Sequence, residues 1–275
     1  MIYDLQKASM WKRISAFLCD IILFAILAVG FALLLSTVLG VDAQQEKMAS
    51  ICSQYIEEYG LNTFMTKEEL DGALSITVTE ERYNVFTEEQ KATLQKAGEA
   101  LYANEDYLYA YGMVNQLILI VITFSILISQ LLLEFVVPLL LKNGQTVGKK
   151  VFGVAVMRID GVKASPVILL VRAILGKYAV ETMIPVFVLL SLLLGTASVV
   201  TLVLLAFLVL AQIALLIFTQ AHTPLHDMLA GTVAVDLASQ LIFDTPEELL
   251  EYKKKIHAES LADKGKKLVN KQKFI

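Results

Sequence analysis

The first apolar run, from Trp11 to Leu39, limits this chain to a small set of folds. The run exceeds the ~20 residues that a helix needs to cross a hydrocarbon core of ~30 Å, so residues 1–40 are expected to form the N-terminus and a first transmembrane helix. Asp20 lies inside the run. A carboxylate in hydrocarbon costs roughly 2.5–3.5 kcal/mol on insertion scales, so its helix face should meet protein or water.

Arg13 lies seven residues before Asp20, which returns both side chains to nearly the same face of a helix. Two interpretations remain open. Asp20 lies close enough to the cytoplasmic interface to be hydrated, with Arg13 extended toward water, or the two residues belong to an internal charge network or transport pathway.

Composition agrees with a membrane protein, since 56% of the 275 residues are hydrophobic and the mean hydropathy is +0.64. These values disfavour a soluble enzyme. The two cysteines, Cys19 and Cys52, are too few and too differently placed to indicate a disulfide framework.

Residues 41–112 form a polar insert, with fourteen acidic and five basic residues and a net charge of −9. Two pairs, Thr66 with Glu69 and Thr87 with Gln90, have the spacing of a helix-capping box. The segment therefore predicts a small acidic helical insert outside the membrane. Tyrosines near its end, among them Tyr107, suit either the membrane interface or the packing of the insert itself.

A second transmembrane helix is predicted over residues 113–141. Its polar residues form one stripe, which should face protein: Gln116, Thr123, Gln130 and Glu134.

Residues 142–181 are expected to form a basic cytoplasmic loop, because seven Lys and Arg residues between Lys142 and Lys177 face a single acidic residue, Asp160. Lys and Arg are retained on the cytoplasmic side, so the N-terminus should also be cytoplasmic and the insert extracytoplasmic. Within the loop, Val151 to Arg158 is β-prone and predicts a short extended segment against the inner membrane face.

The loop also contains Gly144-Gln145-Thr146-Val147-Gly148-Lys149-Lys150, which fails as a phosphate-binding loop, because only three residues separate its glycines and Lys150 stands where Ser or Thr is needed. This motif, Gly153, Asp160-Gly161, Arg172 and the late Leu225-His226-Asp227-Met228-Leu229-Ala230-Gly231-Thr232 resemble the RDD family of small polytopic membrane proteins. The Arg and two Asp that name the family map onto Arg13, Asp20 and Asp227. The resemblance implies a membrane protein, for which transport is one proposed activity, although the large acidic insert departs from the shorter loop usual in the family.

Residues 182–219 predict a third and a fourth transmembrane helix, joined near Gly195-Thr196-Ala197-Ser198. A single long tilted or re-entrant helix is the alternative. Two helices return residues 220–275 to the cytoplasm, where a soluble helix starting at Thr245-Pro246 leads into a Lys-rich tail. That tail either holds anionic lipid at the inner face or is simply solvated.

His222 and His226 have a spacing that can serve a metal, but no third ligand is evident and Pro224 disfavours a regular helix between them. The sequence therefore predicts no metal and no cofactor. His226 and Asp227 are instead expected to bridge loops at the inner face, to Arg13 or Arg172.

No constellation indicates an enzyme or a nucleic-acid partner. Two function classes remain: a transporter of an ion or small solute that uses intramembrane carboxylates, or a scaffold whose acidic outer insert binds a protein partner or a second copy. A plasma-membrane location is expected. Equal depths of Asp20, Glu134 and Gln212 below the inner boundary predict that Asp20 and Glu134 line one inward-open cavity. The expected charge network is Arg13, Asp20, Glu134, Arg172 and Asp227, with Gln130, Gln212 and His226 in support.

Overall fold

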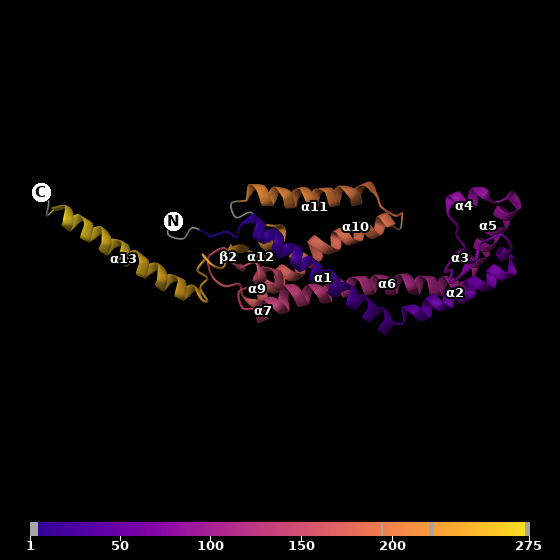
Figure 1. Ribbon diagram of the computed structural model, residues 1–275, viewed down its shortest axis with the longest axis horizontal. Coiled ribbons are helices and arrows are strands. Elements are labelled where there is room, and N and C mark those ends of the chain that lie inside the picture. Colours follow the sequence, from indigo (N-terminus) through magenta and orange to yellow (C-terminus); the bar gives the residue numbers. More distant parts are fainter. Residues whose placement is uncertain (1–4, 194, 220–222, 273–275) are drawn as a thin grey trace. The chain divides into compact units, whose positions relative to one another are not determined.

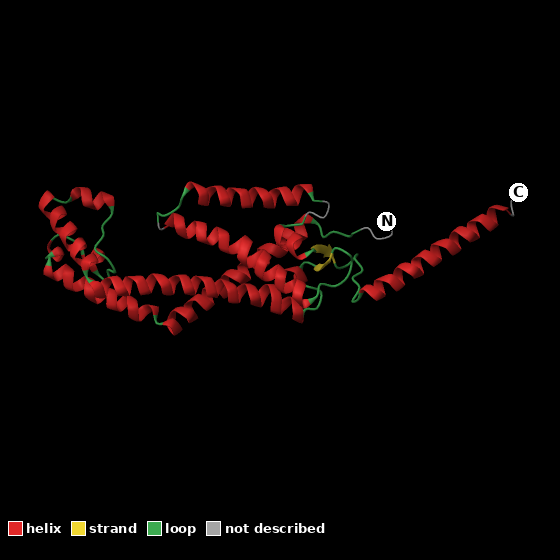
Figure 2. Cartoon of the chain, turned by 180° about the vertical axis from the view of Figure 1, so that it is seen from behind, coloured by secondary structure: helices red, strands yellow, loops and turns green. Residues whose placement is uncertain are grey.

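The computed structural model describes residues 5–193, 195–219 and 223–272, and most of them are helical (Figure 1, Figure 2). The chain divides into two compact units. Unit 1 comprises residues 1–27 and 126–275, and unit 2 comprises residues 28–125. Four of the described helices are long and apolar enough to cross a membrane, as predicted. They are Met10–Leu39, Glu105–Leu140, Pro166–Leu193 and Val199–Phe218.

Two of these spans contain π-helical turns, which the sequence analysis missed. The first span is helix α1 (Met10–Leu39) and the fourth is α11 (Val199–Phe218). The second and third each join several elements: α6 (Glu105–Leu131), the π-helix η2 (Leu132–Val136) and α7 (Val137–Leu140), then α9 (Pro166–Val171), the π-helix η3 (Arg172–Met183) and α10 (Ile184–Leu193).

The third span begins at Pro166, well before residue 182, where the sequence placed it. Ser165 caps this helix by accepting a hydrogen bond from the backbone N–H of Ile168 at 3.4 Å, and Pro166 occupies the first turn, where no N–H is needed. Arg172 therefore lies in a span rather than in the basic loop. The break after Leu193, with Gly195 at a φ of 66° and α11 starting at Val199, excludes one long helix.

An antiparallel two-stranded sheet lies in unit 1, where the sequence predicted only one extended segment. Strand β1 (Val154–Arg158) pairs with β2 (Thr232–Asp236), with Val154 opposite Asp236 and Arg158 opposite Thr232. Four side chains form its buried core: Ala155, Met157, Val233 and Val235. The sheet thus fastens the segment before the third span to the segment after the fourth.

Two short helices flank this sheet in the chain. Helix α8 (Val147–Val151) precedes β1, and Thr146 caps it by accepting a hydrogen bond from the N–H of Lys149 at 3.3 Å. Helix α12 (Leu225–Ala230) precedes β2 and ends at Gly231 in the left-handed conformation, with a φ of 63°. The late motif is therefore a helix followed by a strand.

Unit 2 contains the helical insert and has a hydrophobic core of its own. Its elements after α1 are α2 (Val41–Glu58), a 3-10 turn (Leu61–Thr63), α3 (Lys67–Leu70), α4 (Glu80–Val85), α5 (Glu88–Ala103) and the first part of α6. The second capping box forms as predicted, because Thr87 N–H donates to Gln90 Oε1 at 2.9 Å. Tyr107 is fully buried and donates to the carbonyl of Leu74 at 2.8 Å, so this tyrosine packs the insert.

Helix α13 (Pro246–Gln272) ends the described chain and continues into the Lys-rich tail. Its start is as predicted, because the N–H of Glu248 donates to Thr245 Oγ1 at 3.2 Å.

Candidate functional site

A cavity of about 630 Å³ in unit 1 is lined by side chains from all four candidate spans. Its volume lies within the ~300–1,000 Å³ typical of small-ligand sites. The structure places every residue of the predicted network and its supporting set on the wall of this cavity. These residues are Arg13, Asp20, Gln130, Glu134, Arg172, Gln212, His226 and Asp227.

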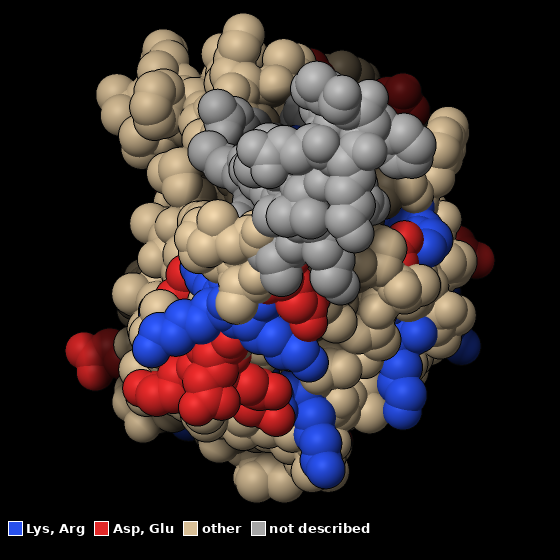
Figure 3. Space-filling view, turned by 90° about the vertical axis from the view of Figure 1, so that its left-hand side faces the viewer, with Lys and Arg blue, Asp and Glu red and all other residues tan. Residues whose placement is uncertain are grey.

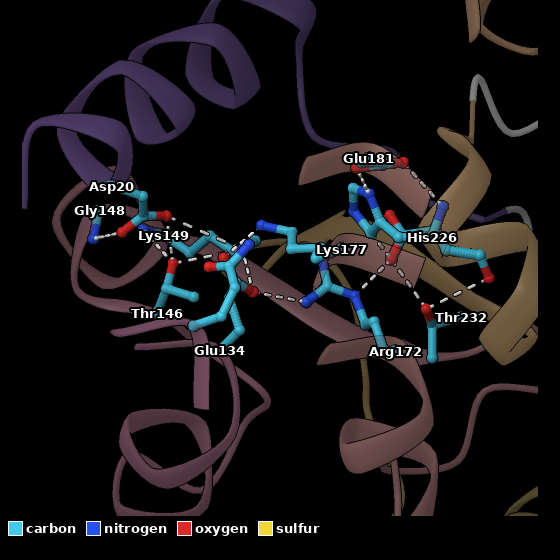
Figure 4. A network of polar contacts seen from close by, with 12 residues as sticks. Asp20, Glu134, Thr146, Gly148, Lys149, Arg172, Lys177, Glu181, His226 and Thr232 are labelled. Carbon is cyan, nitrogen blue, oxygen red and sulfur yellow. Dashed lines mark hydrogen bonds and ion pairs between the residues drawn. The ribbon is translucent and has the colours of Figure 1, made fainter. Parts of the chain in front are cut away.

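Arg172 joins two carboxylates inside unit 1 (Figure 4). Its side chain is 1% exposed, its Nε donates to Asp227 Oδ1 at 2.7 Å, and its Nη1 donates to Glu134 Oε2 at 2.9 Å. Arg172 opens η3, Glu134 lies in η2, and Asp227 lies in α12. A planar guanidinium suits such a bridge, because its donors point in fixed directions.

Asp20 contacts the Gly144–Lys150 motif rather than Arg13. Its Oδ2 accepts a hydrogen bond from the hydroxyl of Thr146, and its Oδ1 accepts one from the backbone N–H of Gly148 at 2.8 Å. Asp20 is only 7% exposed. These contacts agree with an internal charge network and not with a hydrated Asp20 at the interface.

Lys149 lies between the two predicted cavity carboxylates. Its Nζ is 3.9 Å from Asp20 Oδ2 and 3.8 Å from Glu134 Oε2, so the two acids share one ammonium group. Glu134 also accepts a short hydrogen bond from Lys177 Nζ. Burial lowers the pKa of Lys149 to about 8, although the charge of Glu134 opposes this shift.

A fourth acidic side chain of the cavity, Glu181 in η3, was not identified from the sequence. Its Oε2 lies 2.8 Å from Nδ1 of His226, and its Oε1 accepts a hydrogen bond from Nε2 of Gln212 at 2.6 Å (Figure 4). Because a carboxylate can only accept, Nδ1 of His226 carries the proton of this bond. The sequence did contain a pattern that could have identified Glu181. Arg172, Lys177 and Glu181 have i, i+5 and i+9 spacing, which places them on one face of a π-helix of about 4.4 residues per turn.

Asp227 is expected to be ionised within this network. Burial alone would raise its pKa, but the guanidinium of Arg172 outweighs burial and holds the pKa well below its ordinary value. Burial lowers the pKa of His226, against the charge of Asp227. Thr232 completes the site by donating to Asp227 Oδ1 at 2.8 Å. The predicted bridge from Asp227 to Arg172 is thus present, whereas His226 contacts Glu181. The proposed partner in a metal pair, His222, lies outside the described residues.

Arg13 also lines the cavity, but it differs from the other cations there. It is partly exposed, and within the described ranges no hydrogen bond or ion pair within 4.0 Å joins its guanidinium to another residue. Asp227 acts on it electrostatically without direct contact.

Comparisons with known proteins agree with this architecture. Searches of curated proteins and of solved structures found no match. The sequence model of the RDD family matches residues 7–231, which include all four candidate spans and every residue of the network. This chain therefore belongs to the RDD family and is an integral membrane protein with four apolar helices.

Proposed function

We propose that this protein is a small ion-coupled permease whose intramembrane carboxylates bind the coupling cation. One observation carries the proposal: a single cavity, lined by all four candidate spans and by α8 and α12, holds four carboxylates and four Lys or Arg side chains. Charged groups inside a membrane are costly, and those that occur there commonly serve ion or substrate pathways.

Asp20 and Glu134 are the proposed cation ligands. Lys149 contacts both at distances near the outer limit of an ion pair, 3.9 and 3.8 Å, so a cation can compete with it for their oxygens. Arg172 is a poorer candidate for displacement, because it is buried and forms short hydrogen bonds with Glu134 and Asp227. In this proposal Arg172 keeps the site assembled while Lys149 exchanges with the cation.

Cation flux into vesicles tests this role. Purified protein in proteoliposomes should take up radioactive sodium or rubidium ions, and both D20N and E134Q should abolish uptake. The matched control is D160N, because Asp160 is exposed, pairs with Arg158 and does not line the cavity. Wild-type vesicles that take up neither ion, or D20N and E134Q vesicles that retain full uptake, would overturn the proposal.

The proposed orientation places both termini in the cytoplasm and the insert outside the plasma membrane. The excess of Lys and Arg in the basic loop supports this orientation, because such residues are retained on the cytoplasmic side. Figure 3 shows one face of the molecule where Lys and Arg side chains gather beside Asp and Glu side chains, as suits contact with water. Single cysteines replacing the exposed Glu89 and Lys254, in a chain lacking Cys19 and Cys52, should react with an impermeant reagent from opposite sides. Reaction of both from the same side contradicts this orientation. Contact of the Lys-rich tail with anionic lipid stays a prediction.

A scaffold function is the second candidate, and the separate core of unit 2 favours it. The insert packs its own buried cluster around Cys52, Leu101 and Tyr107 and carries a net charge of −9 over residues 41–112. A photo-crosslinking amino acid at exposed Glu89 should then capture one protein partner or a second copy in cells. A scaffold of this kind should show no cation flux in vesicles.

A further inference from the structure

Among the described residues, Arg13 is the one Lys or Arg side chain of the cavity without a hydrogen bond or ion pair to the protein. Lys149, Arg172 and Lys177 each contact at least one carboxylate, with Arg172 at 2.7 and 2.9 Å from its two partners. Arg13 has no such contact in the part of the chain that the structure describes, yet it lines the same cavity. A guanidinium has five N–H donors, and inside a membrane they require an acceptor.

The carboxylates around the cavity each accept hydrogen bonds from other groups of the protein. Asp227 Oδ1 accepts from Arg172 and from Thr232, and Glu181 accepts from Gln212, from His226 Nδ1 and from the backbone N–H of His226 at 3.0 Å. Asp20 accepts from the Gly144–Lys150 motif. The donors of Arg13, which has no direct contact with these groups among the described residues, are therefore available to a ligand that carries its own negative charge.

The wall next to Arg13 is apolar. Helix α1 lines the cavity with Ile14, Phe17, Ile21 and Phe24, whose spacing forms one helical stripe beside the polar stripe of Arg13 and Asp20. Val186 and Leu216 add apolar side chains from α10 and α11. Phe17 is 56% exposed, so this wall has surface available to a ligand. The cavity thus combines an unused guanidinium with a surface that suits a hydrocarbon chain.

We propose that the cavity binds an amphiphilic anion, with a carboxylate or phosphate head group on Arg13 and an apolar tail along the α1 stripe. This inference rests on the proposed function, because it names the substrate class of the proposed permease. A small hydrophilic anion would leave the apolar stripe unused, and an uncharged amphiphile would leave Arg13 without an acceptor. The anion comes either from solution, as a medium-chain carboxylate, or from the bilayer, as an anionic lipid.

Binding in nanodiscs of zwitterionic lipid tests the proposal. Radiolabelled decanoate should bind saturably and be displaced by unlabelled decanoate or decyl phosphate, but neither by decanol nor by acetate at the same concentration. R13Q should weaken decanoate binding about tenfold or more, as expected for loss of a charge-assisted hydrogen bond, and R13K should weaken it less.

K12Q is the matched control. It removes the same charge one residue away, but Lys12 Nζ pairs with Asp236 at 2.6 Å and does not line the cavity, so binding should be unchanged. Equal binding of decanol, or unchanged decanoate binding in R13Q, would overturn the proposal. Loss of binding in R13Q and R13K together with a lowered melting temperature in both would assign Arg13 to folding, which also overturns it.

Native mass spectrometry of protein taken from mixed vesicles distinguishes the two sources. Retention of phosphatidylglycerol over phosphatidylcholine by the wild type and not by R13Q identifies a lipid ligand, whereas decanoate binding without lipid retention identifies a soluble one. Cation flux measured on the same preparation separates this inference from the proposed function. Cation flux without anion binding would overturn only the inference of an amphiphilic anion. Anion binding without cation flux would overturn only the proposed permease function.

Discussion

The backbone N–H of Gly148 lies 2.8 Å from Oδ1 of Asp20, which ties α8 to the polar face of α1. This approach requires a residue without a side chain. A Cβ on Gly148 would lie 2.3 Å from the carbonyl oxygen of Ala16 and 2.9 Å from Asp20 Oδ1. The second glycine of the Gly144–Lys150 motif is thus explained by its contact with an intramembrane carboxylate.

Gly148→Ala should destabilise the protein, because the backbone of α1 or α8 must move to admit the methyl group. Overpacking of this kind costs about 1–3 kcal/mol, and the melting temperature in detergent should fall accordingly. The control is Gly30→Ala, because Gly30 lies in α1 with no atom within 4 Å of its added Cβ, where alanine is the better helix former. A melting temperature that is equal in G148A and wild type would contradict the contact.

Arg172→Gln should be more damaging, because it leaves Glu134 and Asp227 without their shared guanidinium. Removing one partner of a buried ion pair costs roughly 3–5 kcal/mol. Arg172→Lys keeps the charge but loses the two-directional geometry, so its loss should be smaller. Unfolding in increasing sodium dodecyl sulfate measures both, and the exposed pair of Arg158 and Asp160 supplies the control R158Q, which should change little.

Cation affinity should depend on the protonation of Lys149. As the pH rises through about 8, Lys149 loses its proton and with it the positive charge 3.9 Å from Asp20 and 3.8 Å from Glu134. Cation binding at these carboxylates should therefore tighten as the pH rises through this range. Lys149→Arg keeps its charge at every accessible pH, so flux measured at rising pH should lose this increase. An identical pH profile in wild type and K149R would assign the increase to another group.

Deleting residues 45–105 and joining the ends with a flexible linker should leave an inserted and active membrane core. All residues that line the cavity lie outside the deleted segment. Membrane fractionation measures insertion, and cation uptake in vesicles measures the site. Failure to insert would show that the insert takes part in folding the spans.

Hydropathy and charge predicted the four spans and the helical insert, because long apolar runs and capping boxes are local signals. The start of the third span was wrong for a physical reason. A local window counts Arg172, Lys177 and Glu181 as the charges of a loop, whereas in the structure Glu134, His226 and Gln212 from distant segments compensate them. Compensation of this kind has no signature in a window of neighbouring residues.

The sheet escaped prediction in a related way. Val154 to Arg158 was recognisable as extended. Its partner, Thr232 to Asp236, begins directly after a short helix, and two spans separate the two strands along the chain. The structure brings the predicted charge network to one cavity, but several of its contacts differ from those expected. Arg13 and Asp20 share a face of α1 as expected. Asp20, however, accepts hydrogen bonds from Gly148 and Thr146, because the Gly144–Lys150 motif folds back onto α1.

The pairing of β1 with β2 also sets the order in which the molecule can be assembled. During synthesis Glu134 and Arg172 are made before Asp227, the second carboxylate partner of Arg172. Strand β2 follows Asp227 immediately, so the ribosome must complete both later spans before the two strands can meet. Until then the nascent chain holds ionised side chains in hydrocarbon with an incomplete set of partners. Pairing of the two strands and completion of the buried ion pairs are therefore late events in biogenesis. A chain truncated before residue 227 would leave Arg172 without one of its two carboxylate partners.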